Sequence, residues 1–288
     1  MDQSPIDAIV DLDYIEYDAG QVQAVRRPVI VEAPWVLYLD RRELLTMMCT
    51  PVRLHCLALG FLLSEGIIGG LEDLWQLRVF TDEDRLFLLF PEAGICEERH
   101  QHTCAEAVGS IDVRLRRPAP PRPERRILTS GCGGGLTFDD LSAGRAPLRS
   151  ELRLPAAQIC ALMRDMQQHA GLYSQSRGVH TSALYDPQNA ARLALAEDVG
   201  RHNTLDKIRG ECLLAGIDTR DRVLVTSGRI STEMIGKAHR MGVPIVVSRT
   251  SPTVTSVRLA QSWNITLVGY VRSQRLRVYS CPERIGPE

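Results

Sequence analysis

The chain has 288 residues, of which 44% are hydrophobic and 24% charged, so it can hold one large domain or two ordinary domains with a full core. Its formal net charge is −1, which gives no reason to expect binding to nucleic acid or to an anionic membrane surface. The amino terminus is acidic, and no apolar stretch approaches the roughly 18 residues of a membrane span. We therefore expect a cytoplasmic protein without a signal peptide or a membrane helix.

The N-terminal half predicts a β-rich domain that contains one helix. Residues 1–24 are acidic and weakly patterned, which indicates a loose N-terminal arm, and the β-rich domain is expected at residues 25–126. Thr50 is expected to cap the helix, with Pro51 at the first helical position and Gly66 after the end. Strands rich in apolar and β-branched residues are expected at 25–39 (two strands), 77–80, 86–90 and 110–115.

The C-terminal half predicts an α/β domain at residues 154–288, after a glycine-rich linker at 127–153. Strands and helices alternate here, which indicates a mostly parallel sheet covered by helices on both faces. The fold class is thus α/β, or α+β over the whole chain. Strands are expected at 178–185, 193–196, 222–226, 244–248, 265–270 and 276–279, and helices at 155–170, 203–215, 231–241 and 253–263.

Cys132 is the best candidate for a reactive group. It stands among Gly131, Gly133, Gly134 and Gly135, where the backbone is free to move and no neighbouring side chain can bury the thiol. The alternative is a small buried hydrophobe, the usual fate of a free cysteine. That alternative suits the cysteines on apolar helical faces, which are Cys49, Cys56, Cys160 and Cys212.

Three polar loops, 197–203, 227–231 and 248–252, each follow a predicted strand and precede a predicted helix. In a parallel sheet they meet at the carboxyl edge, where open α/β sheets bind ligands. Helix N-termini, hydroxyls and arginines suit phosphate groups. The alternative is ordinary helix capping by serine and threonine. The candidate ligand-binding residues in these loops are Arg201, His202, Asn203, Ser227, Gly228, Arg229, Ser248 and Arg249.

No metal site is expected. The eight cysteines include no C-x-x-C pair, and His100, His102, His180 and His202 do not combine with cysteines at zinc spacings. Neither glycine-rich nucleotide fingerprint is present.

Several long motifs resemble the FdhD-type formate dehydrogenase accessory sulfurtransferases, from about residue 29 to residue 285. These motifs lie at 60–68, 178–181, 197–207, 226–234 and 248–253. The resemblance implies a smaller N-terminal β-rich domain and a C-terminal cytidine-deaminase-like domain of three layers, α/β/α. It also implies that Cys132 takes persulfide sulfur from a cysteine desulfurase. The sulfur would pass to the molybdenum or tungsten bis-guanine-dinucleotide cofactor of formate dehydrogenase.

The resemblance further implies a homodimer and contact with this guanine nucleotide cofactor after the last core strand, at Tyr270, Val271, Arg272, Ser273, Gln274 and Arg275. One position departs from the family, whose loop usually carries Cys-x-x-Cys, because Gly135 stands where the second cysteine is expected. Sulfur release then requires attack on the outer sulfur by the metal centre or a reductant. Two alternatives stay open: a noncatalytic cofactor-binding chaperone and, less favoured, a nucleotide-acting hydrolase.

Overall fold

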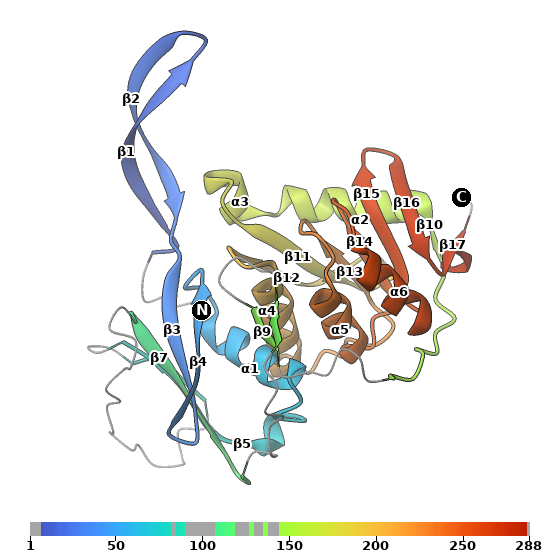
Figure 1. Cartoon of the computed structure of the whole chain (residues 1–288), viewed down its shortest axis with the longest axis horizontal. Helices are drawn as coiled ribbons and strands as arrows, with labels where there is room; N and C mark the ends of the chain where they lie inside the picture. Colours follow the sequence, from blue (N-terminus) through green and yellow to red (C-terminus); the bar gives the residue numbers. More distant parts are fainter. Residues whose placement is uncertain are drawn as a thin grey trace.

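The computed structural model describes residues 7–81, 85–89, 107–118, 127–129, 135–137 and 144–286, with the backbone alone for 85–89, 127–129 and 135–137. It shows a β-rich N-terminal domain beside a larger α/β domain (Figure 1). The predicted fold class is confirmed. No helix in the described ranges is both long and apolar enough to cross a lipid bilayer.

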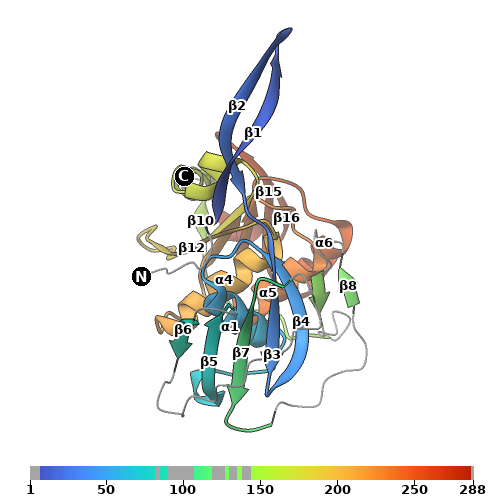
Figure 2. The same cartoon turned by 90° about the vertical axis from the view of Figure 1, so that its left-hand side faces the viewer.

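A hairpin of β1 (Ile9–Asp18) and β2 (Gln21–Ile30) projects beyond both domains as a two-stranded ribbon, and β2 contacts α3 (Gly171–Ser176) of the α/β domain (Figures 1 and 2). The loose arm expected at residues 1–24 is therefore corrected from Ile9 onward. Isoleucine, valine and tyrosine recur along these strands, and such residues favour extended backbone. The connecting residues Ala19 and Gly20 both have positive φ, 47° and 89°, as a tight hairpin turn requires.

Five strands form the N-terminal sheet in the order β4-β3-β7-β5-β6, with β3 and β7 parallel and the other pairs antiparallel. The strands are β3 (Ala33–Leu39), β4 (Arg42–Cys49), β5 (Leu74–Phe80), β6 (Arg85–Leu89) and β7 (Gly109–Leu115). The sequence did not predict β4, because its buried Met47 and Cys49 carry little strand propensity.

The helix of this domain, α1 (Leu54–Ser64), begins later than predicted. Arg53, not Thr50, occupies the N-cap, in the left-handed region at φ 49°. Thr50 instead serves the domain interface: its N–H donates to Asp198 Oδ2 at 3.2 Å, and its carbonyl accepts from Lys207 Nζ at 3.0 Å. The predicted end of the helix at Gly66 is confirmed, with φ 68° at that glycine.

The α/β domain is built on a six-stranded sheet with the order β12-β11-β13-β14-β15-β16. Four strands (β12 to β15) point the same way, but only β13–β14 and β14–β15 are parallel neighbours, because the reversed β11 lies between β12 and β13. Most strands of the sheet therefore share one direction, as predicted, but most neighbouring strands pair in the antiparallel way. The strands are β11 (His180–Tyr185), β12 (Arg192–Asp198), β13 (Val223–Thr226), β14 (Ile245–Ser248), β15 (Thr266–Arg272) and β16 (Arg275–Ser280).

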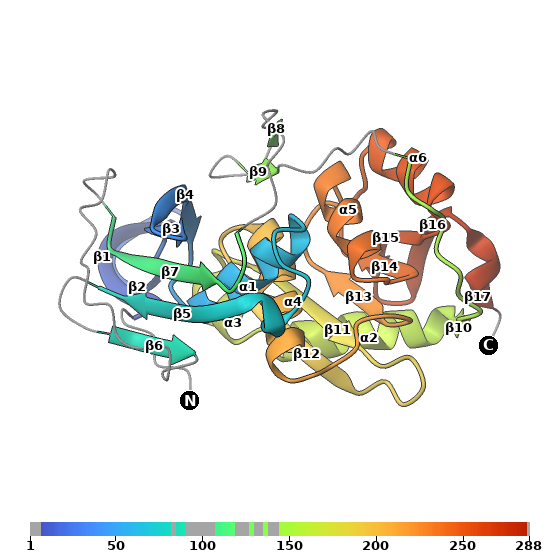
Figure 3. The ribbon, with the colours of Figure 1, turned by 90° about the horizontal axis from the view of Figure 1, so that it is seen from below.

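Helices cover both faces of this sheet, so the domain has three layers (Figure 3). The long helix α2 (Ala156–Gln168) lies on one face and leads into the short α3 (Gly171–Ser176). The opposite face carries α4 (Arg201–Leu214), α5 (Thr232–Arg240) and α6 (Val254–Ser262). Two minor ladders complete the fold: β10 (Leu154–Pro155) with β17 (Ile285–Gly286), and β8 (Ile127–Thr129) with β9 (Gly135–Thr137).

The two domains meet where α1 crosses α4. A Cβ atom at Gly60 would lie 1.7 Å from the Asp206 carbonyl oxygen, and one at Gly210 would lie 2.0 Å from that of Cys56, so only glycine permits this approach. Beside the crossing, Lys207 Nζ pairs with Asp198 Oδ2 at 2.6 Å, and neither side chain has any exposed surface. The N-terminal domain therefore fixes α4, the helix that begins at the carboxyl edge of the larger sheet.

Candidate functional site

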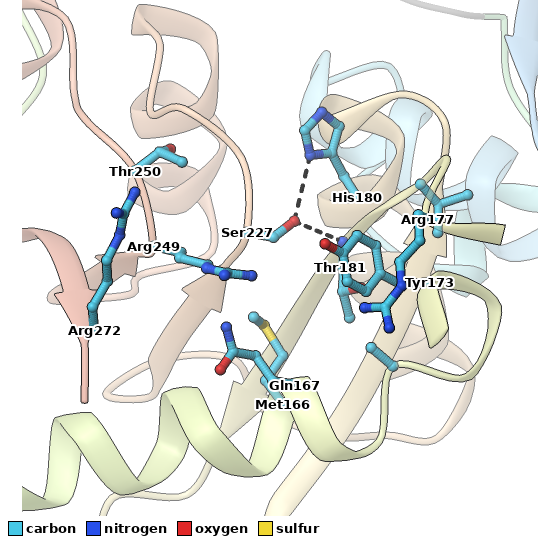
Figure 4. A pocket seen from close by; sticks show the side chains of 12 residues that line it. Met166, Gln167, Tyr173, Arg177, His180, Thr181, Ser227, Arg249, Thr250 and Arg272 are labelled. Atoms are coloured by element: carbon cyan, nitrogen blue, oxygen red, sulfur yellow. Dashed lines mark hydrogen bonds between the residues drawn. The ribbon is translucent and has the colours of Figure 1, made fainter. Parts of the chain in front are cut away.

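A cavity of about 390 Å³ lies at the carboxyl edge of the six-stranded sheet, on the side of α2 and α3 (Figure 4). The loops after β13 and β14, the end of β15 and the start of β11 meet there, as the predicted position of the polar loops requires. The lining residues are Met166, Gln167, Ala170, Tyr173, Arg177, Val179, His180, Thr181, Ser227, Arg249, Thr250 and Arg272.

Three arginines make this cavity cationic. Arg249 and Arg272 stand on one side of it, and Arg177 stands on the other, next to Tyr173 (Figure 4). The Arg177 guanidinium lies 5.1 Å from the centre of the Tyr173 ring, which orients both side chains. Guanidinium groups offer forked donors to phosphate oxygens, so this arrangement suits a ligand with phosphates.

The inner wall of the cavity contains a neutral histidine. Ser227 Oγ accepts the Thr181 N–H at 3.0 Å and lies 3.4 Å from His180 Nδ1. Burial lowers the pKa of His180 below its ordinary 6.5, and the positive charges of Arg201 and Arg229 lower it further against the opposing effect of Asp198. The imidazole is therefore uncharged at neutral pH and can exchange hydrogen bonds with a ligand without adding charge.

The remaining wall is apolar and aromatic. Met166, Ala170 and Val179 are almost fully buried, and the Tyr173 ring stands beside them. A flat ring can lie against such a surface, while the phosphates attached to it reach the arginines. The cavity thus combines the two requirements of a nucleotide-like ligand.

A second polar cluster lies behind this wall, at the N-termini of α4 and α5. His202 Nε2 is 3.1 Å from Ser231 Oγ and 3.5 Å from Glu233 Oε2. Burial, followed by the charges of Lys237, Arg201 and His180, lowers the pKa of His202 to about 2. A catalytic triad needs the serine and the acid on different ring nitrogens, whereas both contact Nε2 here. Ser231 also caps α5 by accepting the Met234 N–H, so the cluster gives the hydrolase alternative no support.

The structure brings three of the predicted loop residues into the cavity: Ser227, Arg249 and Arg272. Gly228 lies beside it, where a Cβ atom would be 3.0 Å from Arg201 Cβ and 3.4 Å from His180 Nδ1. Ser248 is buried and donates to the Gly228 carbonyl at 2.7 Å, so it joins two loops without lining the cavity. Arg229 is exposed and does not line the cavity.

The predicted residues at the start of α4 do not line the cavity either. Arg201 and His202 are buried behind it. Asn203 faces the domain interface, where its Nδ2 donates to the Met48 carbonyl at 3.0 Å and to Asp198 Oδ1 at 2.9 Å. A sequence pattern cannot separate a ligand-binding polar group from one that joins two domains.

Of the segment 270–275, only Arg272 lines the cavity. Tyr270 donates its N–H to the Thr250 carbonyl at 3.0 Å, and Val271 is buried in the core beneath α2. Ser273 and Gln274 form the exposed turn between β15 and β16, and Arg275, also exposed, is the first residue of β16. Their contact with a cofactor stays a prediction.

Sequence reasoning missed the cavity residues from α2 and α3, among them Gln167, Tyr173 and Arg177. No motif marks them, because they reach the cavity only through the packing of α2 on the sheet. His180 and Thr181 do have a signal, since they belong to the motif at 178–181, but they were not named as site residues.

Cys132 lies outside the described residues, between β8 and β9, whose ends Thr129 and Gly135 are paired. The cysteines expected to be buried, Cys49, Cys56, Cys160 and Cys212, are confirmed as buried free thiols. Within the described ranges, no group of three or more His, Cys, Asp or Glu side chains could hold a metal ion. The expected absence of a structural metal stays a prediction.

Comparison with known proteins finds similarity over almost the whole chain. The sequence profile of the FdhD/NarQ family matches residues 30–286. The "Sulfur carrier protein FdhD" of Bacillus subtilis (strain 168) is 34% identical over 279 residues, covering 95% of this chain and 96% of that protein. The protein of the same name from Listeria monocytogenes serotype 4b (strain F2365) is 33% identical over 273 residues, covering 93% and 95%.

Among solved structures, a crystal structure of a protein from Desulfotalea psychrophila, assigned as a formate dehydrogenase accessory protein, has the same fold. It superposes with a TM-score of 0.71 at 27% sequence identity, over 97% of this chain and 100% of that chain. The similarity of fold therefore includes both domains.

Proposed function

We propose, since this chain belongs to the FdhD/NarQ family, that it is a sulfur carrier protein that serves formate dehydrogenase. In this proposal Cys132 accepts persulfide sulfur from a cysteine desulfurase and passes it to the molybdenum or tungsten bis-guanine-dinucleotide cofactor. The cofactor is the substrate of the transfer and not a resident group. The names of the curated relatives support the sulfur-carrier role.

Four other cysteines are poor nucleophiles, which supports Cys132 as the sulfur carrier. Burial is the first cause that raises the pKa of Cys49, Cys160, Cys212 and Cys281, in the case of Cys212 to about 12. These thiols stay protonated at neutral pH, and only a thiolate attacks a persulfide efficiently. The glycines around Cys132 supply backbone N–H groups that can favour its thiolate.

The transfer consists of two exchanges of sulfur. The Cys132 thiolate attacks the outer sulfur of the desulfurase persulfide, so a new S–S bond forms and the desulfurase cysteine leaves as a thiolate. In the second exchange that S–S bond breaks and Cys132 leaves as a thiolate. Its outer sulfur becomes sulfide on the acceptor, and the metal centre or a reducing thiol supplies the two electrons. No resolving cysteine is needed, which is consistent with Gly135 in the loop.

The observation that carries the cofactor half of the proposal is the cavity with Arg177, Arg249 and Arg272. Its volume of about 390 Å³ is near the lower end of ordinary ligand pockets, about 300–1,000 Å³. It therefore suits one guanine nucleotide arm of the cofactor and not the whole molecule. We also propose that formate dehydrogenase and a cysteine desulfurase bind this chain, and that the chain acts as a homodimer.

The test is mass spectrometry of the intact protein after incubation with a cysteine desulfurase and cysteine. Wild type should gain the mass of one sulfur atom, and Cys132→Ala should not. Cys281→Ala is the matched control, because Cys281 is the one described cysteine that is not buried. It should load like wild type. Full loading of Cys132→Ala would overturn the site assignment.

A second measurement separates the carrier from the noncatalytic chaperone. The Cys132→Ala variant should not restore formate oxidation to a strain that lacks its own sulfurtransferase, although it should bind GDP like wild type. A chaperone would need the cavity and not the thiol. Restored formate oxidation with Cys132→Ala would therefore favour the chaperone.

A further inference from the structure

The carboxylate of Glu197, near the end of β12, lies behind the cavity wall. Glu197 is only 6% exposed and does not line the cavity. It begins the motif at 197–207 and pairs across the strands with Thr181, which belongs to the motif at 178–181. Side chains paired in this way lie on the same face of a sheet. Glu197 therefore shares a face with Thr181, which does line the cavity.

Both oxygens of this carboxylate bind the N-terminus of α3. Glu197 Oε2 accepts the Leu172 N–H at 2.8 Å, and Glu197 Oε1 accepts the Tyr173 N–H at 2.9 Å. Oε1 also accepts the Thr181 hydroxyl at 3.2 Å. The first N–H groups of a helix have no partner within the helix, and the N-cap residue Ala170 has no side chain that can supply one. Glu197 supplies these acceptors and places a negative charge at the positive end of the helix.

Helix α3 depends on such an anchor because its own sequence holds it weakly. It has six residues, none of them buried, and a helix of this length is not stable in water by itself. Strand β2 contacts α3, but the two bonds to Glu197 are charge-assisted, which is the stronger kind of hydrogen bond. The position of α3 on the sheet is therefore set largely by Glu197.

A continuous series of contacts leads from Glu197 to the cations of the cavity. Glu197 binds the N–H of Tyr173, and the Tyr173 carbonyl accepts the Arg177 N–H at 2.9 Å. Arg177 ends the helix at φ 58°, with its guanidinium 5.1 Å from the centre of the Tyr173 ring. This pair stands across the cavity from Arg249 and Arg272 (Figure 4). A shift of α3 would thus displace an aromatic surface and a cation of the cavity together.

We propose that Glu197 is a positioning residue of the nucleotide site, which holds α3 so that Tyr173 and Arg177 face the ligand. The inference rests on the guanine nucleotide proposed as ligand. Glu197 does not line the cavity, so it acts through α3 and not by contact with the nucleotide. Its negative charge on its own would repel phosphate groups. Placement of α3 and charge alone therefore predict opposite effects when the charge is removed.

The substitution Glu197→Gln separates these two effects, because it keeps the size of the side chain. The amide oxygen can accept one N–H of α3, but the amide NH2 would face the other N–H, donor against donor. The dissociation constant for GDP, measured by isothermal titration calorimetry at fixed salt, should rise about tenfold, the loss expected for one ionic contact such as that of Arg177. Removal of a repulsive charge alone would lower it. An unchanged or lower dissociation constant would overturn the inference.

Glu211→Gln is the matched control for this substitution. Glu211 pairs with Arg53 at 2.6 Å across the domain interface and does not line the cavity, so the variant should bind GDP like wild type. Thermal unfolding checks that each variant folds. If Glu197→Gln does not fold, Glu197→Asp decides the question, because it keeps the charge and is too short to reach both N–H groups. It should also raise the dissociation constant, and a wild-type value would contradict the inference.

A double-variant cycle gives a readout that a general loss of stability would not change. Independent losses of about tenfold each would multiply to about a hundredfold. Glu197→Gln combined with Arg177→Ala should lose clearly less, because the second change removes a contact that the first has already displaced. Combined with Arg249→Ala, on the loop after β14, the two losses should multiply. Equal coupling to both arginines, or no coupling to Arg177, would refute the role of α3.

Hydrogen–deuterium exchange without nucleotide tests the anchor by itself. The backbone of residues 171–177 should exchange faster in Glu197→Gln than in wild type or Glu211→Gln, because the N-terminus of α3 loses a hydrogen-bond partner. Unchanged exchange would refute the inference whatever the ligand. A wild type that does not bind GDP would remove the proposed ligand and the positioning role with it, even where the exchange rates confirm that Glu197 holds α3.

Discussion

Two arginines three residues apart offer a sharp test of the cavity. Arg272 at the end of β15 lines it, whereas Arg275 at the start of β16 is exposed and does not. The family motif alone assigns both to cofactor binding. We expect Arg272→Ala to weaken the binding of GDP and Arg275→Ala to leave it within about twofold of wild type, as rim charges usually do.

The size of the effect follows from the type of contact. A charge-assisted hydrogen bond contributes about 1.5–3 kcal/mol, and every 1.4 kcal/mol or so is a tenfold change in affinity. Arg272 is exposed before the ligand binds, so solvent screening reduces its contribution toward the lower limit. Arg272→Ala should therefore raise the dissociation constant for GDP roughly tenfold.

Isothermal titration calorimetry with GDP at fixed salt measures both variants beside wild type. Equal losses for Arg272→Ala and Arg275→Ala would mean that the whole turn binds the nucleotide and that the cavity does not define the site. No loss for Arg272→Ala, or no binding by wild type, would remove the cavity from the proposed function. Salt must be held constant because the contacts are ionic.

Two further predictions concern stability. Lys207→Met should lower the free energy of unfolding by roughly 3–5 kcal/mol in urea titrations, because it leaves Asp198 buried without its cation. The control is Arg220→Met, which should change the free energy of unfolding little, since the Arg220–Asp218 pair has the same 2.6 Å separation but is exposed. His202 has a folded pKa of about 2, so below pH 6.5 the unfolded chain binds a proton that the folded chain does not, and stability falls as pH falls. Between about pH 6.5 and pH 5 this loss of stability is roughly 2 kcal/mol. The variant His202→Gln should remove the loss. An unchanged pH dependence of the unfolding free energy in that variant would contradict His202 as its cause.

The sequence predicts most of the α/β domain because each element there has a local signal. The helix expected at 203–215 is observed at Arg201–Leu214, and the helix expected at 231–241 at Thr232–Arg240. The position of β11 between β12 and β13 is not predictable in this way, because strand order depends on contacts between distant residues. The hairpin strand β1 was missed since both of its faces mix apolar and acidic residues, which hides the usual alternation.

The candidate site is predictable only where a rule of fold topology applies. Ser227 and Arg249 were found because they follow strands that end at the carboxyl edge. Asn203 satisfies the same rule and nevertheless bonds across the domain interface. Tyr173 and Arg177 lie on or next to α3, a six-residue helix without a sequence signal, so only the folded chain shows that they face the arginines of the opposite wall.

The cavity combines a fixed inner wall with adjustable cations, and the fixed wall depends on the domain interface. Gly228 packs against Arg201 at the start of α4. The loop before α4 is held through Asp198, which accepts hydrogen bonds from the backbone N–H groups of Thr50 and Gly200 while pairing with Lys207. The wall is therefore positioned before any ligand arrives, whereas the exposed Arg249 and Arg272 can follow the phosphates. For the guanine nucleotide that we propose as ligand, the wall would select the ring and the arginines would bind the phosphates, while the N-terminal domain, which supplies none of the cavity's lining residues, would act by holding the wall in place.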